Sequence, residues 1–200
     1  MINQIKKRLK SFKGVPPAHD LPKAAVLIAV TNENQPSVLY TLRSKKVSSH
    51  SGEVSFPGGM SEERDTSLVE TALRESEEEI GLRKESVNIV GSLDTMVSRF
   101  NISVTPFVGI IPAETKLSSS SEEIEAFFKV PLPFLLDDNR FRNDPVKRGK
   151  KTFYVPAYKY DSYIIWGLTA MITVNFLNLV FDAHIDLSKP VKPIGEKDDL

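Results

Sequence analysis

The chain of 200 residues contains no cysteine. This absence excludes disulfide bonds, thiolate metal sites and cysteine nucleophiles. Charge of one sign is not in surplus either, because 26 basic side chains balance 26 acidic ones. A protein with no net field has no general attraction for DNA or RNA, although a local basic cluster can still hold a small phosphorylated ligand. The composition therefore argues against a nucleic-acid partner and leaves a small-molecule partner open.

Long hydrophobic runs are also missing. The longest candidate, 170–180, is interrupted by Thr173, Asn175 and Asn178, and it is shorter than the roughly 20 residues that a membrane-spanning helix needs. We therefore expect no membrane span. Residues 2–13 combine apolar side chains at helical spacing with five cations, which predicts an amphipathic helix lying on the domain. A transit peptide is the alternative interpretation of this segment.

The length and the 40% apolar content predict one domain over residues 1–200 with one compact core. The last residues, about 190–200, end in a sequence similar to an endoplasmic-reticulum retrieval signal. Such a signal has no meaning without a secretory signal peptide, so we expect a flexible, solvated tail. The default location is the cytoplasm, with the mitochondrion or peroxisome as alternatives for a eukaryotic protein. The sequence is compatible with a homodimer but does not fix the oligomeric state.

The distribution of apolar residues predicts more strands than helices. Strands are expected at 24–30, 37–44, 53–56, 87–97, 102–111, 124–132, 152–160 and 163–167. Helices are expected at 2–13, 67–80 and 168–181, with a short helix or turn at 133–138. Because the long helices fall at the start, middle and end of this series, the order predicts an α/β fold. We expect an α/β/α sandwich, in which helices cover both faces of a mixed β-sheet.

The middle helix carries signals for both of its ends. Ser67 and Glu70 have the spacing of a capping box, and Gly81 stands where a left-handed C-terminal cap is expected. Apolar periodicity assigns one stripe of this helix to the core. The stripe consists of Val69, Ala72, Leu73, Ser76 and Ile80.

Three glutamates lie on a different face of the same helix. Glu75, Glu78 and Glu79 fall within about 100° of one another, and like charges at this spacing destabilise a helix by roughly 0.2–0.5 kcal/mol per pair. A solvated acidic face is the ordinary explanation. It does not explain why the acids follow a glycine turn at 58–59, where the backbone can approach another group closely.

A divalent cation would remove the repulsion between these acids. Mg²⁺ and Mn²⁺ prefer oxygen ligands, and Mg²⁺ commonly combines carboxylates with substrate phosphate oxygens. The pattern therefore predicts a Mg²⁺ or Mn²⁺ site made by Glu75, Glu78 and Glu79 beside the backbone of Gly59. Arg74 lies four residues before Glu78 and is expected to pair with it.

This arrangement resembles the Nudix box, G-x5-E-x7-R-E-U-x-E-E-x-G-U, in which U is aliphatic. The matching positions within 59–82 are Gly59, Arg74, Glu75, Glu78, Glu79, Gly81 and Leu82. Asp65 stands where the first glutamate is expected, one extra residue separates it from Arg74, and Ser76 replaces an aliphatic residue. The resemblance implies a Nudix-type sandwich and a metal-dependent hydrolase that cleaves phosphoric anhydride bonds.

The residues before the box resemble the signature of the coenzyme A diphosphatase branch, L-L-T-x2-R-S-x3-R-x3-G-x3-F-P-G-G. The positions that match in register are Arg43, Ser44, Gly52, Phe56, Pro57, Gly58 and Gly59. Ser48 replaces the second arginine of the pattern, and its first residues are Leu39, Tyr40 and Thr41. This resemblance implies hydrolysis of the diphosphate in coenzyme A or its thioesters. The products would be 3′,5′-ADP and 4′-phosphopantetheine or its acyl derivative.

The same resemblance implies a set of substrate contacts. Arg43, with Lys45 or Lys46, would contact a substrate phosphate, and Ser44 and Gly58 complete the predicted substrate-binding residues. Ordinary surface charge is the alternative for the two lysines.

The general base is the least determined part of the predicted site. Glu123, in a polar acidic loop, occupies the family position for such a glutamate, and we interpret it as the base, with Glu78 and Arg74 as the other catalytic residues. A solvated acidic loop is the alternative, in which case Glu75 becomes the leading candidate. We expect His50 to shape its loop rather than act as the base.

Two other functions remain open at this stage. The box itself does not encode the substrate, so the enzyme could act on another nucleoside diphosphate derivative such as ADP-ribose. A non-catalytic module that senses a nucleotide is the alternative outside enzymes. The intact acids of the helix argue against it, because such a module is expected to lose its metal-binding carboxylates.

Overall fold

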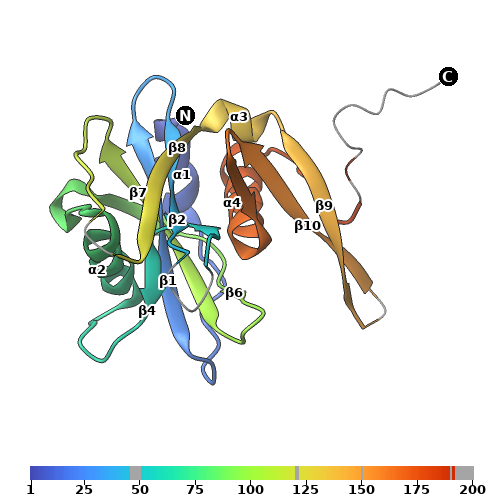
Figure 1. The fold of residues 1–200 in the computed structure, drawn as a ribbon, viewed down its shortest axis with the longest axis horizontal. Coiled ribbons are helices and arrows are strands. Elements are labelled where there is room, and N and C mark those ends of the chain that lie inside the picture. Colours follow the sequence, from blue (N-terminus) through green and yellow to red (C-terminus); the bar gives the residue numbers. More distant parts are fainter. Residues whose placement is uncertain (46–50, 120–121, 150, 190, 192–200) are drawn as a thin grey trace.

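The computed structural model describes residues 1–45, 51–119, 122–149, 151–189 and 191 (Figure 1). The predicted tail, apart from residue 191, therefore lies outside the described residues. The helices are α1 (Ile2–Ser11), α2 (Leu68–Ile80), α3 (Leu132–Leu136) and α4 (Gly167–Phe181), and a 3₁₀ turn spans Lys84–Ser86. The strands are β1 (Lys23–Asn32), β2 (Ser37–Arg43), β3 (Val54–Ser55), β4 (Gly58–Met60), β5 (Asn88–Ser92), β6 (Met96–Val97), β7 (Ser103–Pro112), β8 (Ile124–Pro131), β9 (Arg140–Arg148), β10 (Lys151–Tyr160) and β11 (Tyr163–Trp166).

The two faces of the large sheet carry separate hydrophobic cores, and β1 contributes to both. Ala25, Leu27 and Ala29 pack with α2, whereas Ile28 and Val30 pack in the core that includes α1 and α4. All five side chains are fully buried, since alternate residues of a strand point to opposite faces of the sheet. Figure 1 shows α2 and α4 on opposite sides of this sheet. The predicted α/β/α sandwich is confirmed.

The large sheet is mixed, as predicted, with the central order β3-β2-β1-β7-β5. Strands β1 and β7 run parallel, and the other paired strands run antiparallel. β1 and β2 pair at Val30 and Val38, and beyond this point the segment 54–60 enters between them. Its position is held by a hydrogen bond of 2.8 Å from the amide of Leu27 to the carbonyl of Pro57. This insertion carries the glycine turn into the sheet on the side of α2.

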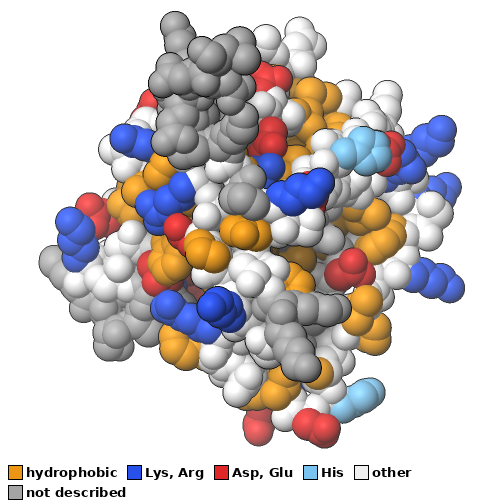
Figure 2. Space-filling view, turned by 90° about the vertical axis from the view of Figure 1, so that its right-hand side faces the viewer, with side chains coloured by type: hydrophobic (Ala, Val, Ile, Leu, Met, Phe, Trp, Pro, Cys, Tyr) orange, Lys and Arg blue, Asp and Glu red, His pale blue; other side chains and the backbone are white. Residues whose placement is uncertain are grey.

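A second sheet of three strands, β11-β10-β9, extends the molecule beyond α4. Figure 2 looks onto this side of the molecule, where apolar side chains lie between charged ones. The sequence analysis missed β9 because Arg140–Arg148 is rich in charged residues and includes Pro145. Proline is tolerated there because β9 pairs with β10 alone among the strands that the structure describes.

The amphipathic segment at the start of the chain folds onto the domain, as predicted. The helix ends at Ser11, two residues earlier than expected, and buries Ile5 and Leu9. It lies so close to β5 that a Cβ atom at Gly91 would come within 2.8 Å of the Leu9 Cβ. Arg8 forms an ion pair with Asp182 at the end of α4. In the part of the chain that the structure describes, no helix is long and apolar enough to cross a membrane.

Candidate active site

Helix α2 begins and ends where its caps predict. The Ser67 hydroxyl accepts a hydrogen bond from the amide of Glu70 at 3.2 Å, while the Glu70 carboxylate accepts one from the amide of Thr66 at 2.8 Å. The Glu70 carboxylate thus binds the amide of Thr66, whereas in a standard capping box it would bind the amide of the N-cap residue, Ser67. Gly81 is left-handed, with φ of 64°. Its amide donates to the carbonyl of Glu77 at 3.0 Å, which closes the last turn.

The buried face of α2 differs from the predicted apolar stripe, because Val69 and Leu73 are only half-buried. Ala72, Ser76 and Ile80 are fully buried, as predicted, but Thr71 is buried as well and Glu79 is only 5% exposed. The Ser76 hydroxyl donates to the carbonyl of Ala72 at 2.6 Å, so its burial leaves no polar group without a partner. The alternative of one solvated acidic face is therefore wrong for Glu79, which is buried beside these residues.

The two glycines of the turn allow the turn to pack closely between helix α2 and strand β1. Gly58 has φ of 149°, and a Cβ atom there would collide with the carbonyl of Ala25. A Cβ atom at Gly59 would lie 2.5 Å from the carboxyl carbon of Glu75. Only glycine therefore fits at Gly58, whereas a side chain at Gly59 would displace the Glu75 carboxylate. The backbone amide of Gly58 is free to donate a hydrogen bond to the Glu79 carboxylate at 3.2 Å.

The Glu79 carboxyl is in an unusual electrostatic state. Burial raises its pKa to about 8, although the Gly58 amide and the Arg43 guanidinium both act to lower it. The closest Arg43 nitrogen is 3.7 Å from the carboxylate, longer than a normal charge-assisted hydrogen bond. Burial also raises the pKa of Glu75, with Arg74 opposing the shift. Near neutral pH, such a pKa favours a Glu79 carboxyl that keeps its proton or is compensated by a positive partner, either Arg43 or a bound cation.

Arg74 holds the acidic residues around the helix in position. Its guanidinium donates to both oxygens of Asp65 at 2.9 and 3.0 Å, to Glu75 at 2.8 Å, to Glu78 at 3.2 Å and to the carbonyl of Met60 at 3.1 Å. The predicted pairing of Arg74 with Glu78 is therefore present. Glu78 lies on the solvent side, with its side chain 51% exposed.

Asp65 is a site residue that the sequence analysis noted only as a departure from the motif. Its side chain is 1% exposed, and it also accepts hydrogen bonds from the amide of Glu62 and the hydroxyl of Thr71, both at 2.9 Å. The hydrogen bonds from Arg74 hold the pKa of Asp65 well below its usual range. Its motif position was the available signal. The shorter side chain and the extra residue before Arg74 still allow a two-point contact.

Arg43 connects the upstream motif with helix α2 and with the acidic loop. It lies between Glu79 and Glu123, and its guanidinium donates to the Glu123 carboxylate at 3.2 Å. The main chain of Glu123 is also fixed, since its carbonyl accepts a hydrogen bond from the amide of Ser44 at 2.7 Å. The structure therefore brings together residues that are 80 positions apart in the sequence.

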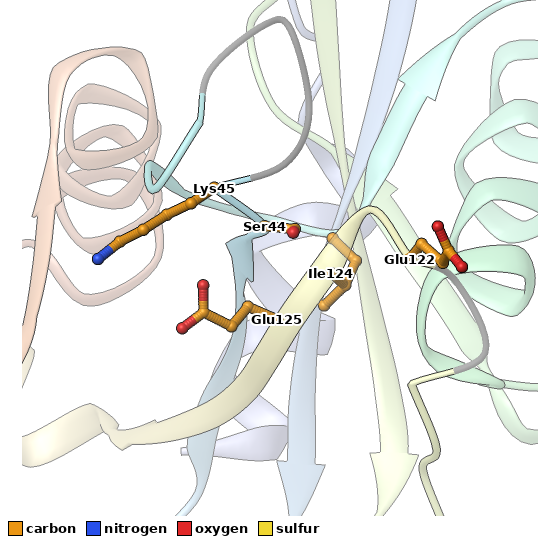
Figure 3. Close-up of a pocket in the computed structure, with 5 residues that line it drawn as sticks. All are labelled: Ser44, Lys45, Glu122, Ile124 and Glu125. Atoms are coloured by element: carbon orange, nitrogen blue, oxygen red, sulfur yellow. The ribbon is translucent and has the colours of Figure 1, made fainter.

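A cavity of about 350 Å³ opens beside this cluster. It is lined by Ser44, Lys45, Glu122, Ile124 and Glu125. Lys45 and Glu125 extend to the same side of β8 in Figure 3, whereas Glu122 lies on the side of α2. Of the other predicted loop positions, residues 46, 48 and 50 lie outside the described residues.

Comparisons with known proteins agree with this geometry. The family model of the NUDIX domain matches residues 21–146. The chain belongs to the Nudix family. It is 39% identical over 149 residues to a Yersinia enterocolitica protein described as an uncharacterized Nudix hydrolase NudL, covering 74% of this chain and 76% of the relative. A NudL protein of Escherichia coli is also 39% identical, over 75% of this chain and 78% of its own.

A solved structure supports the Nudix fold. The MutT/nudix family protein from Enterococcus faecalis superposes with a TM-score of 0.55 and 15% identity, covering 85% of this chain and 66% of that one. Nudix enzymes act on small-molecule substrates and generally use a divalent metal cation.

The donor chemistry around the turn fits such a cation. Glu75 and Glu79 place carboxylates beside the Gly58–Gly59 backbone, and oxygen donors suit a hard ion. Within the described ranges, however, no three acidic side chains form a ready metal cage. Arg43 and Arg74 neutralise these acids instead. The oxygen donors and their positions therefore suit a cation. For a cation to bind, Glu75 and Glu79 must give up their contacts with Arg74 and Arg43.

Replacing Asp65 by asparagine should destabilise the protein. The change removes the charge that holds Arg74, whose side chain is only 12% exposed, and breaking such a buried pair costs about 3 kcal/mol of the free energy of unfolding. Asp144→Asn is the matched control, because Asp144 and Arg142 are both 47% exposed and such pairs contribute less than about 1 kcal/mol. Urea denaturation measures both values, and equal losses would contradict the role of Asp65.

The effect of Asp65→Asn should also depend on pH. A lowered pKa in the folded protein means that the carboxylate stabilises the fold fully above the unfolded pKa of about 3.9. This contribution is lost as the pH falls from there through the folded pKa. The difference between wild type and variant should thus be equal at about pH 7 and pH 5 and smaller at about pH 3.

Proposed function

We propose that this Nudix hydrolase cleaves the diphosphate of coenzyme A and its thioesters, releasing 3′,5′-ADP and 4′-phosphopantetheine or its acyl derivative. The observation that carries the proposal is the position of Arg43. This residue belongs to the sequence pattern that resembles the coenzyme A diphosphatase branch, and it contacts Glu79 of the box helix. The pattern that would select the substrate and the helix that would hold the cation are therefore parts of one site.

Each side chain has a distinct part in the proposed reaction. A Mg²⁺ or Mn²⁺ ion, when bound, would neutralise the charge of the diphosphate and of the transition state. Glu75 and Glu79, beside the backbone of Gly59, would hold this ion. Glu78 would join them from the solvent side, where it now pairs with Arg64 and Arg74.

The substrate contacts come from the other side of the turn. Arg43 would release Glu79 and Glu123 and bind a phosphate oxygen, for which its planar guanidinium is well suited. Ser44, Lys45 and the backbone of Gly58 would complete the contacts. Lys45 extends from the wall of the cavity, so it can reach a group bound there.

Glu123 remains the proposed general base. Its main chain is fixed by Ser44, so any movement toward substrate would come from its side chain, which is 58% exposed. Release of Arg43 toward a phosphate would free the carboxylate to accept a proton from water. Glu75 is the alternative base, because Arg74 orients it on the helix.

A second substrate class is favoured by one feature of the sequence. Ser48 stands where the related pattern has an arginine, which removes a charge that could bind the 3′-phosphate of coenzyme A. A nucleoside diphosphate derivative without that phosphate, such as ADP-ribose, is therefore the alternative. A non-catalytic sensor is disfavoured because Glu75, Glu78 and Glu79 are all present.

Coenzyme A should be a better substrate than 3′-dephospho-coenzyme A. A charge-assisted contact to the 3′-phosphate contributes roughly 1.5–3 kcal/mol, so kcat/KM should differ by about 10-fold or more. Mass spectrometry of the products formed with Mg²⁺ measures both reactions and identifies the bond that breaks. Equal kcat/KM values would reject recognition of the 3′-phosphate, and faster hydrolysis of ADP-ribose would reject the proposed substrate.

Glu123→Gln should lower kcat and remove the acidic limb of the pH–rate profile, with little change in Mg²⁺ affinity. Glu122→Gln is the matched control, since it removes a neighbouring carboxylate at the cavity and should keep both properties. If Glu123→Gln retains full kcat and the acidic limb, Glu123 is not the base, and Glu75 takes its place.

A further inference from the structure

Helix α1 presents a strongly basic face away from the domain. Taking Ile5 as the reference on the helical wheel, Lys6, Lys10 and Lys7 fall at about 100°, 140° and 200°, whereas Leu9 falls beside Ile5. Ile5 and Leu9 are buried, and the three lysines are exposed. The apolar side of the helix therefore packs against the domain, and the lysines lie on its solvent-exposed side.

Contacts with α4 and β5 fix the direction of this face. Arg8 pairs with Asp182, and the Gln4 side chain donates to the carbonyl of Val180 at 3.0 Å. The close approach at Gly91 adds a contact with β5. Because these contacts involve none of Lys6, Lys7 and Lys10, those lysines can be changed without removing the helix from the domain.

The charge of the whole molecule is unevenly divided. Residues 1–14 hold five of the 26 basic side chains and none of the 26 acidic ones, which leaves 21 basic against 26 acidic side chains in the remaining chain. A protein with this charge distribution orients its basic face toward a negatively charged surface, because the surface attracts residues 1–14 and repels the net-acidic remainder of the chain. In the described part of the chain, no acidic side chain forms an ion pair with Lys6, Lys7 or Lys10.

A recess adjoins the basic face at Lys6. Lys6 lines a cavity of about 420 Å³ together with the polar residues Asn32, Glu85, Ser86 and Asn88. Because the Glu85 carboxylate balances the Lys6 ammonium in this lining, the recess adds hydroxyl and amide groups beside the basic face but no net positive charge.

We propose that the outer face of α1 is a docking surface for an anionic lipid bilayer. Clusters of lysine on a helix bind such surfaces by summed electrostatic attraction, and binding here would be peripheral and reversible. A nucleic acid fits this face less well. Arg8, the arginine of the segment, is held by Asp182, and sequence-tolerant nucleic-acid sites combine basic grooves with exposed aromatic side chains.

Vesicle co-sedimentation of the full chain tests the docking surface. The protein should sediment with vesicles that contain one third phosphatidylglycerol and remain in solution with pure phosphatidylcholine. High salt should release it, because exposed charges are screened. The triple variant Lys6→Gln, Lys7→Gln, Lys10→Gln should bind the anionic vesicles at least about tenfold more weakly. Its thermal unfolding should match that of the wild type.

A matched triple variant distinguishes binding through the face of α1 from binding through positive charges elsewhere on the protein. Lys116→Gln, Lys147→Gln and Lys159→Gln remove the same charge from exposed positions elsewhere and should leave vesicle binding unchanged. The proposal would be overturned if the wild type does not bind anionic vesicles, or if both triple variants lose vesicle binding equally. It would also be overturned if the full chain binds duplex DNA at a salt concentration at which it does not bind vesicles. None of these measurements depends on the substrate of the enzyme.

Discussion

The candidate active site depends on one buried carboxylate. Glu79 lies on the inner side of α2, where the amide of Gly58 donates to it and Arg43 approaches to 3.7 Å. A carboxylate in this position is costly without a positive partner. Three separate segments of the chain must therefore meet around it: the end of β2, the glycine turn and the box helix. Their meeting makes the site.

The fold provides this meeting point by separating two strands. β1 and β2 pair near Val30 and Val38, and the turn enters where they part. Gly58 is needed because the backbone of Ala25 leaves no room for a Cβ atom, and Gly59 leaves the space that the Glu75 carboxylate occupies. Arg74, held by Asp65, then fixes the acids on the outer side of the helix. Arg43 and Arg74 thus contact Glu79 and Glu75, the acids that we propose as ligands of the cation.

Local patterns in the sequence predicted much of this architecture. Apolar periodicity located β1, β2 and α4, and the caps of α2 followed from Ser67 and Gly81. Periodicity could not reveal that Glu79 is buried, because a buried acid depends on partners that are distant in sequence. The same reason explains the missed contacts of Asp65. β9 was missed because its stability comes from pairing with β10 rather than from its own composition.

The proposed role of Glu79 as a cation ligand is tested most directly by calorimetry. The experiment measures Mn²⁺ binding and is combined with turnover measured in Mg²⁺. Glu79→Gln should weaken Mn²⁺ binding and lower turnover at least about 100-fold. Glu77→Gln removes the same charge from the exposed side of the same helix and should change neither by more than a small factor. Wild-type Mn²⁺ affinity and turnover in Glu79→Gln would contradict the account.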